Sequence, residues 1–459
     1  NDNGWSYGPT VSKLSSGLTH LRLNPQYVQA REQLRHMLRR IPGLGPLAYS
    51  GVHGLAIALR EVVTPHRFFE ALGVRYAGPI DGHDIAGMEV ALAHAAKWDG
   101  PIVVHVLTQK GCGYGPAEED EIQRLHDFKV QPAPSPGDGP APTSYTDSFS
   151  SAVLAAADAN DDVVAITAAM PGPTGLLPFE AKYPDRFLDV GIAEQHAVTA
   201  AAGMAMAGLR PVVAVYSTFF SRAFDQANLD VGLHGLPVVF ALDRAGITGD
   251  DGPSHHGILD MSLALAIPGM AVFAPSSAEE IGVMLDTALT LEGPAIVRFP
   301  KTPARHVDDG SVGHGLSARC LRRGDGAVCL LAVGKMVEAA DEAAAKLAAD
   351  GIDATVWDVR VVSPPDVEML SDAGRHRLVV TVEDGVRVGG AGTFLLDALR
   401  TVAPGDGAGP ATVVLGVPRS FIDHAKPDRI LADLGLDGPG IAATVAAALA
   451  EGHDHLGEN

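Results

Sequence analysis

Asp189-Val-Gly-Ile-Ala-Glu-Gln-His196 is the stretch that decides the fold, because it places one carboxylate, Glu194, at the head of a run of small apolar residues. The residues that follow predict a buried helix; they include Ala197, Val198, Ala200, Ala201 and Ala202. A carboxylate beside such a helix has to be paired, protonated or functional, because an unpaired buried charge is costly. A Glu that merely caps the helix N-terminus is the alternative interpretation.

Short apolar runs separated by helical patterns indicate α/β architecture along the whole chain. The runs that we expect to be strands are 101–108, 162–167, 211–215, 237–242, 295–298, 328–333, 354–357 and 378–382, and 336–350 is expected to be a helix. Their continuous apolar character is typical of parallel strands covered on both faces. We therefore predict three α/β domains with mainly parallel sheets: 1–130, 143–310 and 320–459, with a Pro-rich linker at 131–142. Ligands bind at the carboxyl ends of such strands, and the loops from Tyr216, Asp243 and Phe299 onward begin there.

Composition narrows the class of protein. The formal net charge of −21 over 459 residues argues against a nucleic-acid partner, which would need a basic surface. No apolar run reaches the roughly 18 residues of a membrane span. Cys112, Cys320 and Cys329 are too few and too scattered for a disulfide framework or a zinc site. We expect a cytoplasmic protein with no membrane and no nucleic-acid partner.

Four segments together resemble one enzyme family. The Glu194 segment resembles the motif with which thiamine-diphosphate enzymes activate their cofactor. Asp243–Gly257, Val215–Gln226 and Gly78–Asp84 resemble segments of the 1-deoxy-D-xylulose-5-phosphate synthase family, and the similarity extends from Asn1 to about Ala425. Transketolases and 2-oxo acid dehydrogenases share the Glu motif without the rest of this set.

The resemblance implies a transketolase-like fold and a thiamine-diphosphate-dependent transferase that also requires Mg²⁺. It implies the decarboxylative condensation of pyruvate with glyceraldehyde 3-phosphate, a homodimer, and a place in isoprene and thiamine biosynthesis. A transketolase-type enzyme, which handles ketose phosphates without decarboxylation, is the alternative activity. The Asp243–Gly257 segment argues against it.

The resemblance also assigns cofactor-binding residues. Glu194 would be catalytic by promoting the imino tautomer of the aminopyrimidine, which calls for a carboxyl group with proton affinity raised by a dry environment. Ile192 would belong to the apolar wedge that bends the cofactor. Phe219 would stack on the pyrimidine, with Arg222 one helical turn further on; a plain core aromatic is the alternative for Phe219.

The resemblance assigns the binding of the diphosphate and the metal to residues in the first part of the chain. Asn3 matches the magnesium ligand of the family, with the main-chain carbonyl of Trp5 completing the set, and hard oxygen ligands suit Mg²⁺. Lys110 follows an expected strand and would reach the diphosphate; a solvated surface Lys is the alternative.

The substrates are assigned in the same way. The phosphate of glyceraldehyde 3-phosphate calls for cations, for which Arg244 is the first candidate and Lys301 or Arg298 the second, with Lys301 favoured. Tyr216 and Asp251 match hydroxyl-binding positions. His255 matches a substrate-contacting, catalytic histidine, whereas a His in a polar loop would otherwise be surface decoration.

The opening part of one family motif has no counterpart in this sequence. The diphosphate and magnesium motif of the family opens with Gly-Asp-Gly and closes with an Asn-Asp-Asn-like segment, of which Asn1-Asp-Asn3 is the closing part. The three Gly-Asp-Gly triplets, at 137–139, 324–326 and 405–407, fit ordinary turns. We therefore expect a family member without its N-terminal segment, from either a longer protein or a natural truncation. The rival of another class is a non-catalytic or split subunit that needs a separate N-terminal half.

Overall fold

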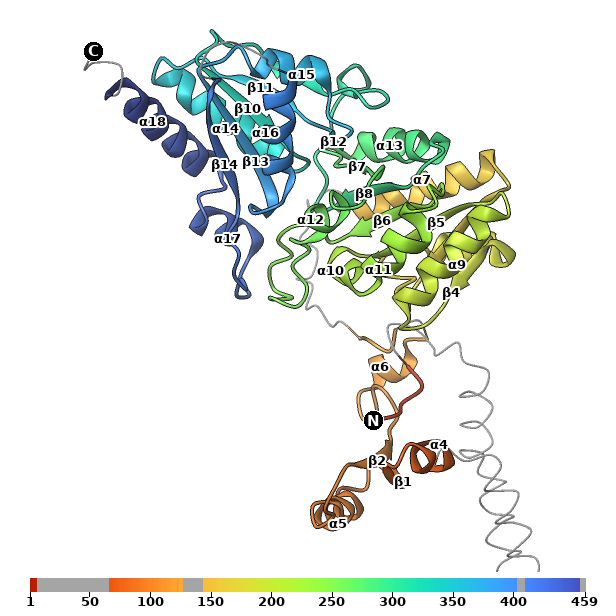
Figure 1. The fold of residues 1–459 in the computed structure, drawn as a ribbon. Coiled ribbons are helices and arrows are strands. Elements are labelled where there is room, and N and C mark those ends of the chain that lie inside the picture. The colour runs from red at the N-terminus through yellow and green to blue at the C-terminus, as the bar shows by residue number, and fades with distance from the viewer. Residues whose placement is uncertain (6–65, 122, 127–142, 403–408, 455–459) are drawn as a thin grey trace, which may run out of the picture. The chain divides into compact units, whose positions relative to one another are not determined.

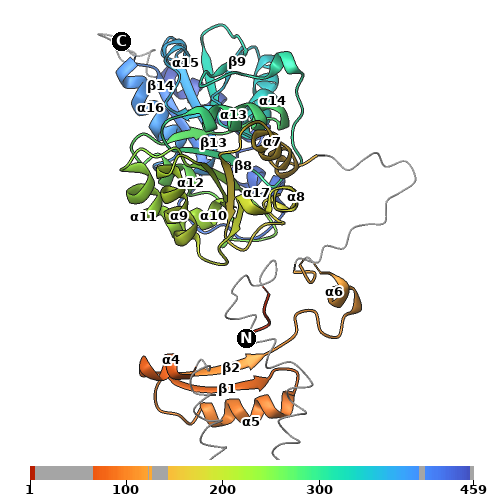
Figure 2. The same cartoon turned by 90° about the vertical axis from the view of Figure 1, so that its right-hand side faces the viewer.

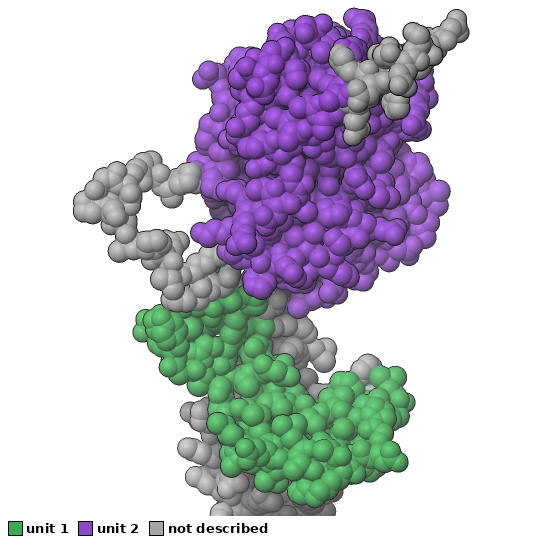
Figure 3. All heavy atoms as spheres, turned by 90° about the vertical axis from the view of Figure 1, so that its left-hand side faces the viewer, with its two compact units in different colours: residues 1–132 green, residues 133–459 purple. Residues whose placement is uncertain are grey.

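A computed structural model describes residues 1–5, 66–121, 123–126, 143–402 and 409–454. They fall into two compact units, residues 1–132 and 133–459 (Figure 3). The predicted linker 131–142 lies outside the described residues. Each unit is an α/β structure, and the prediction of α/β domains with mainly parallel sheets is confirmed.

Unit 1 has a two-stranded parallel sheet with α5 packed along it (Figure 2). Its described elements are α4 (His66–Ala71), β1 (Arg75–Asp81), α5 (Ile85–Ala95), β2 (Ile102–Leu107) and α6 (Gly115–Glu119). Asp84 begins α5, because its side chain accepts a hydrogen bond from the main-chain N–H of Gly87. The expected strand 101–108 corresponds to β2.

The first half of unit 2 is built on a seven-stranded sheet (Figure 1). Its helices and turns are α7 (Tyr145–Ala159), α8 (Leu177–Lys182), η1 (Pro184–Arg186), α9 (Glu194–Met206), α10 (Ser217–Phe220), η2 (Ser221–Ala223), α11 (Phe224–Gln226), η3 (Ala227–Gly232), α12 (Asp260–Ala264), α13 (Ala278–Thr290) and η4 (Asp309–Ser311). Its strands are β3 (Val163–Thr167), β4 (Phe187–Asp189), β5 (Arg210–Tyr216), β6 (Val239–Asp243), β7 (Ala271–Phe273) and β8 (Ala295–Phe299), joined by β12 (Val361–Ser363) from further along the chain.

The strand order is β12-β7-β8-β6-β5-β3-β4, and every pairing is parallel except the one between β12 and β7. Alternate residues of the strands form one core with α7 and α13, in which Phe149 and Phe299 stack at 5.3 Å between ring centroids. Ser144 fixes the start of α7 through a capping box with Asp147. The predicted helix after Glu194 is α9, whose Ala197, Val198, Ala201 and Ala202 are buried as expected.

The second half of unit 2 is a five-stranded sheet in the order β14-β13-β10-β11-β9, parallel except for β9. Its elements are β9 (Arg319–Arg322), β10 (Val328–Ala332), α14 (Met336–Ala349), β11 (Thr355–Asp358), α15 (Val367–Ala373), β13 (Leu378–Val386), α16 (Ala391–Val402), β14 (Ala411–Val417), α17 (Pro427–Asp433) and α18 (Gly438–Asp454). Its core takes in residues of α14, α17 and α18.

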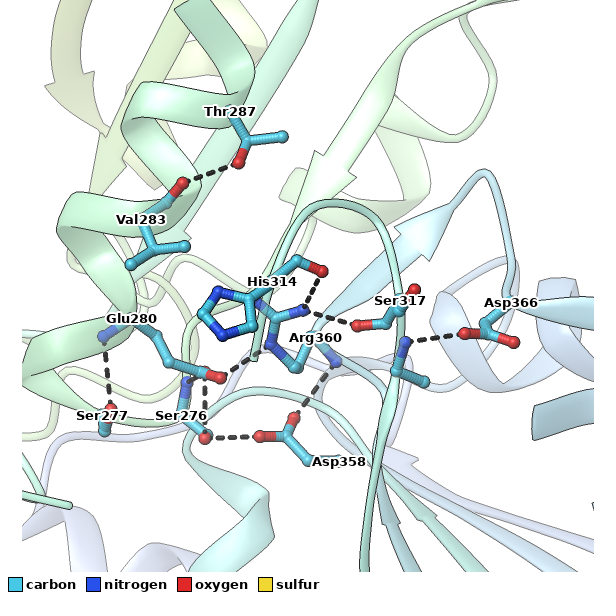
Figure 4. Close-up of polar contacts among 11 residues, drawn as sticks. Ser276, Ser277, Glu280, Val283, Thr287, His314, Ser317, Asp358, Arg360 and Asp366 are labelled. Carbon is cyan, nitrogen blue, oxygen red and sulfur yellow. Dashed lines mark hydrogen bonds and ion pairs between the residues drawn. The ribbon is translucent and has the colours of Figure 1, made fainter. Parts of the chain in front are cut away.

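A buried polar cluster joins the two halves of unit 2 (Figure 4). The Arg360 side chain is fully buried and donates to Glu280 of α13 at 2.7 Å, while its Nη1 lies 3.3 Å from the carbonyl of His314 in the connecting segment. Ser276 Oγ lies 2.6 Å from a carboxylate oxygen of Asp358 and 3.2 Å from one of Glu280. These contacts and strand β12 make the two sheets parts of one compact unit.

The segment Pro427–Ala450 is apolar and long enough to cross a membrane by length and composition alone. It is divided into α17 and α18, with a break from Leu434 to Asp437. Both helices place residues in the core of the five-stranded sheet, namely Ile430, Leu431, Ile441 and Val445. The segment is thus accounted for as core helices of this domain.

Candidate active site

The candidate residues of unit 2 follow the carboxyl ends of strands β4, β5, β6 and β8. These strands end at Asp189, Tyr216, Asp243 and Phe299, and they run parallel in one sheet. Their ends therefore share one edge of the sheet, as the doubly wound pattern predicts. We call this edge, with the segments 190–194, 216–222, 244–257 and 300–301 that leave it, the carboxyl-edge site.

Glu194 is the first residue of α9, and its side chain is buried, with 5% of the residue exposed. The turn before it is fixed by Asp189 Oδ1, which accepts from the N–H groups of Ala169 at 2.7 Å and Gly191 at 2.9 Å. Ile192 lies in the same turn and is 72% exposed. A buried carboxylate at a helix N-terminus next to an exposed aliphatic side chain is unusual for a turn that serves packing alone.

Three aromatic rings from two of these segments lie together. Tyr216 and Phe219 stack, with centroids 5.6 Å apart and an interplanar angle of 12°. The His255 imidazole meets the ring of Phe219 edge-on at 5.6 Å. The Arg222 guanidinium lies 5.7 Å from the centroid of Phe219. The structure thus brings four sequence-predicted residues into one cluster.

Arg244 begins the loop after β6 in a left-handed conformation, with φ of 60°. Its Nη1 donates to the carbonyl of Pro173 at 2.7 Å and lies 3.0 Å from Asp243 Oδ1, and its guanidinium lies 4.1 Å above the ring of Tyr216. Burial raises the pKa of Asp243, while the neighbouring Arg244 and a hydrogen bond from Thr146 act in the opposite direction. The guanidinium is thereby held at the edge of the sheet.

Lys301 and Arg298, the two alternatives for a second cation, have different surroundings. Lys301 Nζ donates to Asp251 Oδ2 at 2.8 Å, and both side chains are about one quarter exposed, 25% and 27%. Arg298 is 3% exposed and is paired with Asp260 at 2.7 Å and Asp384 at 2.9 Å. Burial alone would lower the pKa of Arg298, but the two carboxylates raise it above its ordinary value. Two carboxylates thus already surround Arg298, whereas Lys301 lies nearer the surface beside one.

In unit 1, residues Asn1–Trp5 lie beside the end of β2. The N–H of Asp2 donates to the carbonyl of Val106 at 2.7 Å, and the N–H of Thr108 donates to the carbonyl of Asp2 at 3.0 Å. Asn3 Oδ1 accepts from the N–H of Trp5 at 2.9 Å, so a hydrogen bond joins the two residues that are expected to bind magnesium.

Lys110 lines a pocket of about 690 Å³ in unit 1, together with His83, Gln109 and His126. Its Nζ lies 2.9 Å from His126 Nδ1, and partial burial lowers the pKa of Lys110. His83 Nε2 accepts from the N–H of Gln109 at 2.8 Å, which fixes the start of the Lys110 loop. His83 lies within the Gly78–Asp84 motif, but no pattern in the sequence indicated a role for it.

Among the residues that the structure describes, no cluster of three or more His, Cys, Asp or Glu side chains could hold a metal ion. A metal bound through an amide and a main-chain carbonyl, with cofactor phosphates supplying further oxygens, needs no such cluster. The oxygens of Asn3 and Trp5 are of the type that Mg²⁺ prefers, and the residues present fit the metal.

Comparisons with known proteins agree with this arrangement. The profiles of the transketolase pyrimidine-binding domain and the transketolase C-terminal domain match residues 141–306 and 317–453. Together with the fold, they define a thiamine-diphosphate-dependent enzyme of the transketolase type. A profile for 1-deoxy-D-xylulose-5-phosphate synthase matches residues 1–108. The chain belongs to the 1-deoxy-D-xylulose-5-phosphate synthase family.

Curated relatives carry the same description. The 1-deoxy-D-xylulose-5-phosphate synthase of Mycobacteroides abscessus is 43% identical over 100% of this chain and 72% of its own length. That of Thermobifida fusca is 44% identical over 98% of this chain and 71% of its own length. The activity expected from the sequence, the decarboxylative condensation of pyruvate with glyceraldehyde 3-phosphate, is confirmed at the level of the family.

Two solved structures share the fold. A chain described as a split-gene transketolase, inactive β4 tetramer, is 28% identical with a TM-score of 0.61, covering 68% of this chain and 99% of its own. A transketolase from Campylobacter jejuni has a TM-score of 0.57 at 16% identity, covering 83% of this chain and 68% of its own. The prediction of a transketolase-like fold is confirmed.

Proposed function

We propose that the carboxyl-edge site binds the aminopyrimidine ring of thiamine diphosphate and both substrates of the synthase reaction. The observation that carries this proposal is Glu194, a buried carboxylate that begins α9 and lies two residues after the exposed Ile192. Ile192 offers an apolar surface against which the cofactor can bend. Phe219, partly buried beside Tyr216, offers a ring face to the pyrimidine.

Glu194 is the group that shares a proton with the pyrimidine ring nitrogen. Thiamine diphosphate, when bound, supplies the nucleophilic carbon and the electron sink that decarboxylation of a 2-oxo acid requires. The buried position of Glu194 favours this role because a carboxyl group shielded from water exchanges a proton with a ligand rather than with solvent. Arg222, next to Phe219, would contribute positive charge at the same edge.

The remaining residues of the carboxyl-edge site are assigned to substrates. Arg244 and Lys301 would bind the phosphate of glyceraldehyde 3-phosphate, because both are cations at partly exposed positions of this edge. Asp251 would accept a hydrogen bond from a substrate hydroxyl group, and Tyr216 would donate one to a substrate hydroxyl group. His255, held by Ser254 Oγ at 2.8 Å, would move a proton to or from the substrate.

For the cofactor diphosphate and Mg²⁺ we propose Lys110, Asn3 and the carbonyl of Trp5, all in unit 1. The pocket that Lys110 lines supports the first assignment, and the hydrogen bond from the Trp5 N–H to Asn3 Oδ1, which holds these two residues together, supports the second. We also propose a cytoplasmic homodimer. The thiol state of Cys112, Cys320 and Cys329, all unpaired, suits a reducing compartment.

Glu194→Gln tests the central assignment. Glutamine keeps the size of the side chain but cannot exchange the proton, so exchange of the thiazolium C2 proton of bound cofactor with D₂O should slow by about 10²–10⁴-fold. Rapid quench and ¹H NMR measure this exchange. Glu338→Gln, at an exposed glutamate in the first turn of α14, is the matched control and should leave the rate unchanged. A Glu194→Gln protein that exchanges C2 at the wild-type rate would remove Glu194 from the mechanism.

A further inference from the structure

The loop between β3 and α8, residues 168–176, leaves the same edge of the sheet as the carboxyl-edge site; we call it the β3–α8 loop. Thr167, the last residue of β3, lies in parallel register between Asp189 of β4 and Ala214 of β5. The loop has no titratable side chain. Its buried residues are Ala168, Ala169, Met170, Thr174 and Leu176. A buried loop without reactive groups, beside a catalytic edge, has to act through its shape and its main chain.

The first end of the β3–α8 loop contacts the turn before Glu194. Asp189 Oδ1 accepts from the N–H of Ala169, in the loop, and from the N–H of Gly191, in the turn, at 2.7 and 2.9 Å. Ala169 has φ of 62°, a left-handed conformation that is uncommon for a residue with a Cβ. Such a conformation persists only where its surroundings enforce it. One carboxylate oxygen thus joins the loop to the turn that leads into Glu194.

The second end of the loop contacts Arg244. The carbonyl of Pro173 accepts from Arg244 Nη1 at 2.7 Å. The same Nη1 lies 3.0 Å from Asp243 Oδ1, and Asp243 Oδ2 accepts from Thr146 Oγ1 of α7 at 2.7 Å. The direction of the guanidinium is therefore set by one carbonyl of the loop and by one buried carboxylate.

The interior of the loop is closed by hydrogen bonds. Thr174 donates to the carbonyl of Met170 twice, from Oγ1 at 2.7 Å and from its N–H at 3.1 Å. The carbonyl of Gly175 accepts from Ser150 Oγ of α7 at 2.6 Å. Gly175 has φ of 75°, and a Cβ there would lie 3.1 Å from the carbonyl of Thr146, so the loop packs closely on α7. A displacement of one end of the loop is therefore passed to the other.

We propose that the β3–α8 loop is a positioning element that ties the turn before Glu194 to Arg244. It reaches the turn through Asp189 and the guanidinium through the carbonyl of Pro173. It thereby fixes the carboxylate on the cofactor side relative to the cation on the substrate side. The inference rests on the proposed function for the roles of Glu194 and Arg244, whereas the link between them rests on the contacts alone.

Variants of Asp189 test the link to the turn. Alanine removes the acceptor, whereas the amide oxygen of asparagine can take the place of Oδ1 and accept from both N–H groups. Hydrogen–deuterium exchange of the full chain without cofactor, resolved at single amides, is the measurement. In Asp189→Ala, exchange at Ala169 and Gly191 should both rise roughly tenfold or more, while α14 keeps its protection. Asp189→Asn should keep both amides near the wild-type rate.

Thr174→Val tests whether the loop acts as one element. Valine has nearly the shape of threonine but lacks the hydroxyl that donates to Met170. We expect slower exchange of the thiazolium C2 proton of bound cofactor and a higher KM for glyceraldehyde 3-phosphate, each by roughly three- to tenfold. KM for pyruvate, which carries no phosphate, should stay near wild type. Thr287→Val is the matched control, because Thr287 Oγ1 of α13 also donates to the carbonyl four residues earlier, that of Val283, at 2.7 Å; it should change none of these values.

Unchanged exchange at Ala169 and Gly191 in Asp189→Ala would overturn the link to the turn. An effect of Thr174→Val on C2 exchange alone, or on KM alone, would overturn the single element, as would no effect on either. The Glu194→Gln measurement tests the role of Glu194 separately. A failure of the proposed function is therefore distinguishable from a failure of this inference.

Discussion

Arg298 and Lys301 lie near the end of the same strand, β8, and their side chains differ in burial. Arg298 lies within β8, and its side chain is enclosed with Asp260 and Asp384; Lys301 lies just beyond the strand and pairs with Asp251 at the protein surface. An exposed pair of this kind contributes little to stability, about 0–1 kcal/mol, and can be exchanged for a ligand at low cost. We therefore propose Lys301, rather than Arg298, as the second cation for the substrate phosphate.

Lys301→Ala should raise KM for glyceraldehyde 3-phosphate by about ten- to hundredfold and leave KM for pyruvate nearly unchanged, because only the first substrate carries a phosphate. Lys301→Arg should retain tight binding, since a guanidinium can bind phosphate through two bonds. Initial-rate kinetics with each substrate varied in turn provides the measurement. Lys182→Ala removes a more exposed lysine, paired with Asp158, and should change neither constant. Equal KM values for wild type and Lys301→Ala would refute the phosphate role.

The loop between β6 and α12, residues 244–257, which we call the substrate loop, has its two ends joined by hydrogen bonds. The N–H of Gly246 donates to the carbonyl of Gly257, and the N–H of Gly257 donates to the carbonyl of Gly246, both at 2.8 Å. Ser217 Oγ, next to Tyr216, donates to the carbonyl of Gly257 at 3.1 Å. The loop therefore leaves and re-enters the sheet edge at a fixed place, which orients its polar residues.

Gly257→Ala should damage activity more than stability. The added Cβ would lie 2.4 Å from both the carbonyl oxygen of Arg244 and Ser217 Oγ, so the base of the loop has to open. We expect kcat/KM to fall by roughly 10²-fold. Gly203→Ala in α9 has no neighbour within 4 Å and should be neutral or stabilise the protein by about 0.5–1 kcal/mol. Thermal unfolding and kinetics of both variants check this; wild-type kcat/KM in Gly257→Ala would contradict it.

The central strands of this fold could be predicted from apolar patterning, because parallel strands covered on both faces are continuously apolar, as in Val328–Ala332. Short strands such as β7 and β12, of three residues each, were not predicted. The edge that gathers the loops from Tyr216 and Asp243 onward followed from strand direction. The place of Glu194 did not, because β4, the strand before it, is only three residues long and shows no apolar run. Sequence could not indicate that Arg298 is buried, because its partner Asp384 comes from another sheet. The same holds for Ile247, whose side chain packs in the core of the five-stranded sheet. A side chain whose neighbours come from another domain leaves no local pattern in the sequence.

At the scale of the molecule, the buried polar cluster around Arg360 and Glu280 joins the two sheets of unit 2 (Figure 4). Ser276 Oγ has one proton and faces carboxylates of Asp358 and Glu280. A proton on Asp358 resolves this conflict, because Asp358 can then donate to Ser276, which donates to Glu280. In agreement, burial and the nearby Glu280 raise the pKa of Asp358 to about 7.

This proton makes stability depend on pH. The pKa of Asp358 is about 7 in the folded state, which is higher than its ordinary value of 3.8. The stability that the protonated carboxyl group contributes is therefore full below the ordinary value and is lost as the pH rises through about 7. Asp358→Asn, which cannot ionise, should flatten this part of the curve. Urea unfolding between pH 5 and pH 8 measures it. Asp341→Asn, at an exposed carboxylate, is the control. Equal pH dependence in wild type and Asp358→Asn would contradict the shared proton.

The most direct test of the central claim is carbon dioxide release from pyruvate by this 459-residue chain with thiamine diphosphate and Mg²⁺, with and without glyceraldehyde 3-phosphate. We expect release that the aldehyde phosphate stimulates, with 1-deoxy-D-xylulose 5-phosphate formed in equal amount. Folded protein that binds the cofactor but releases no carbon dioxide under these conditions would contradict the account of the carboxyl-edge site.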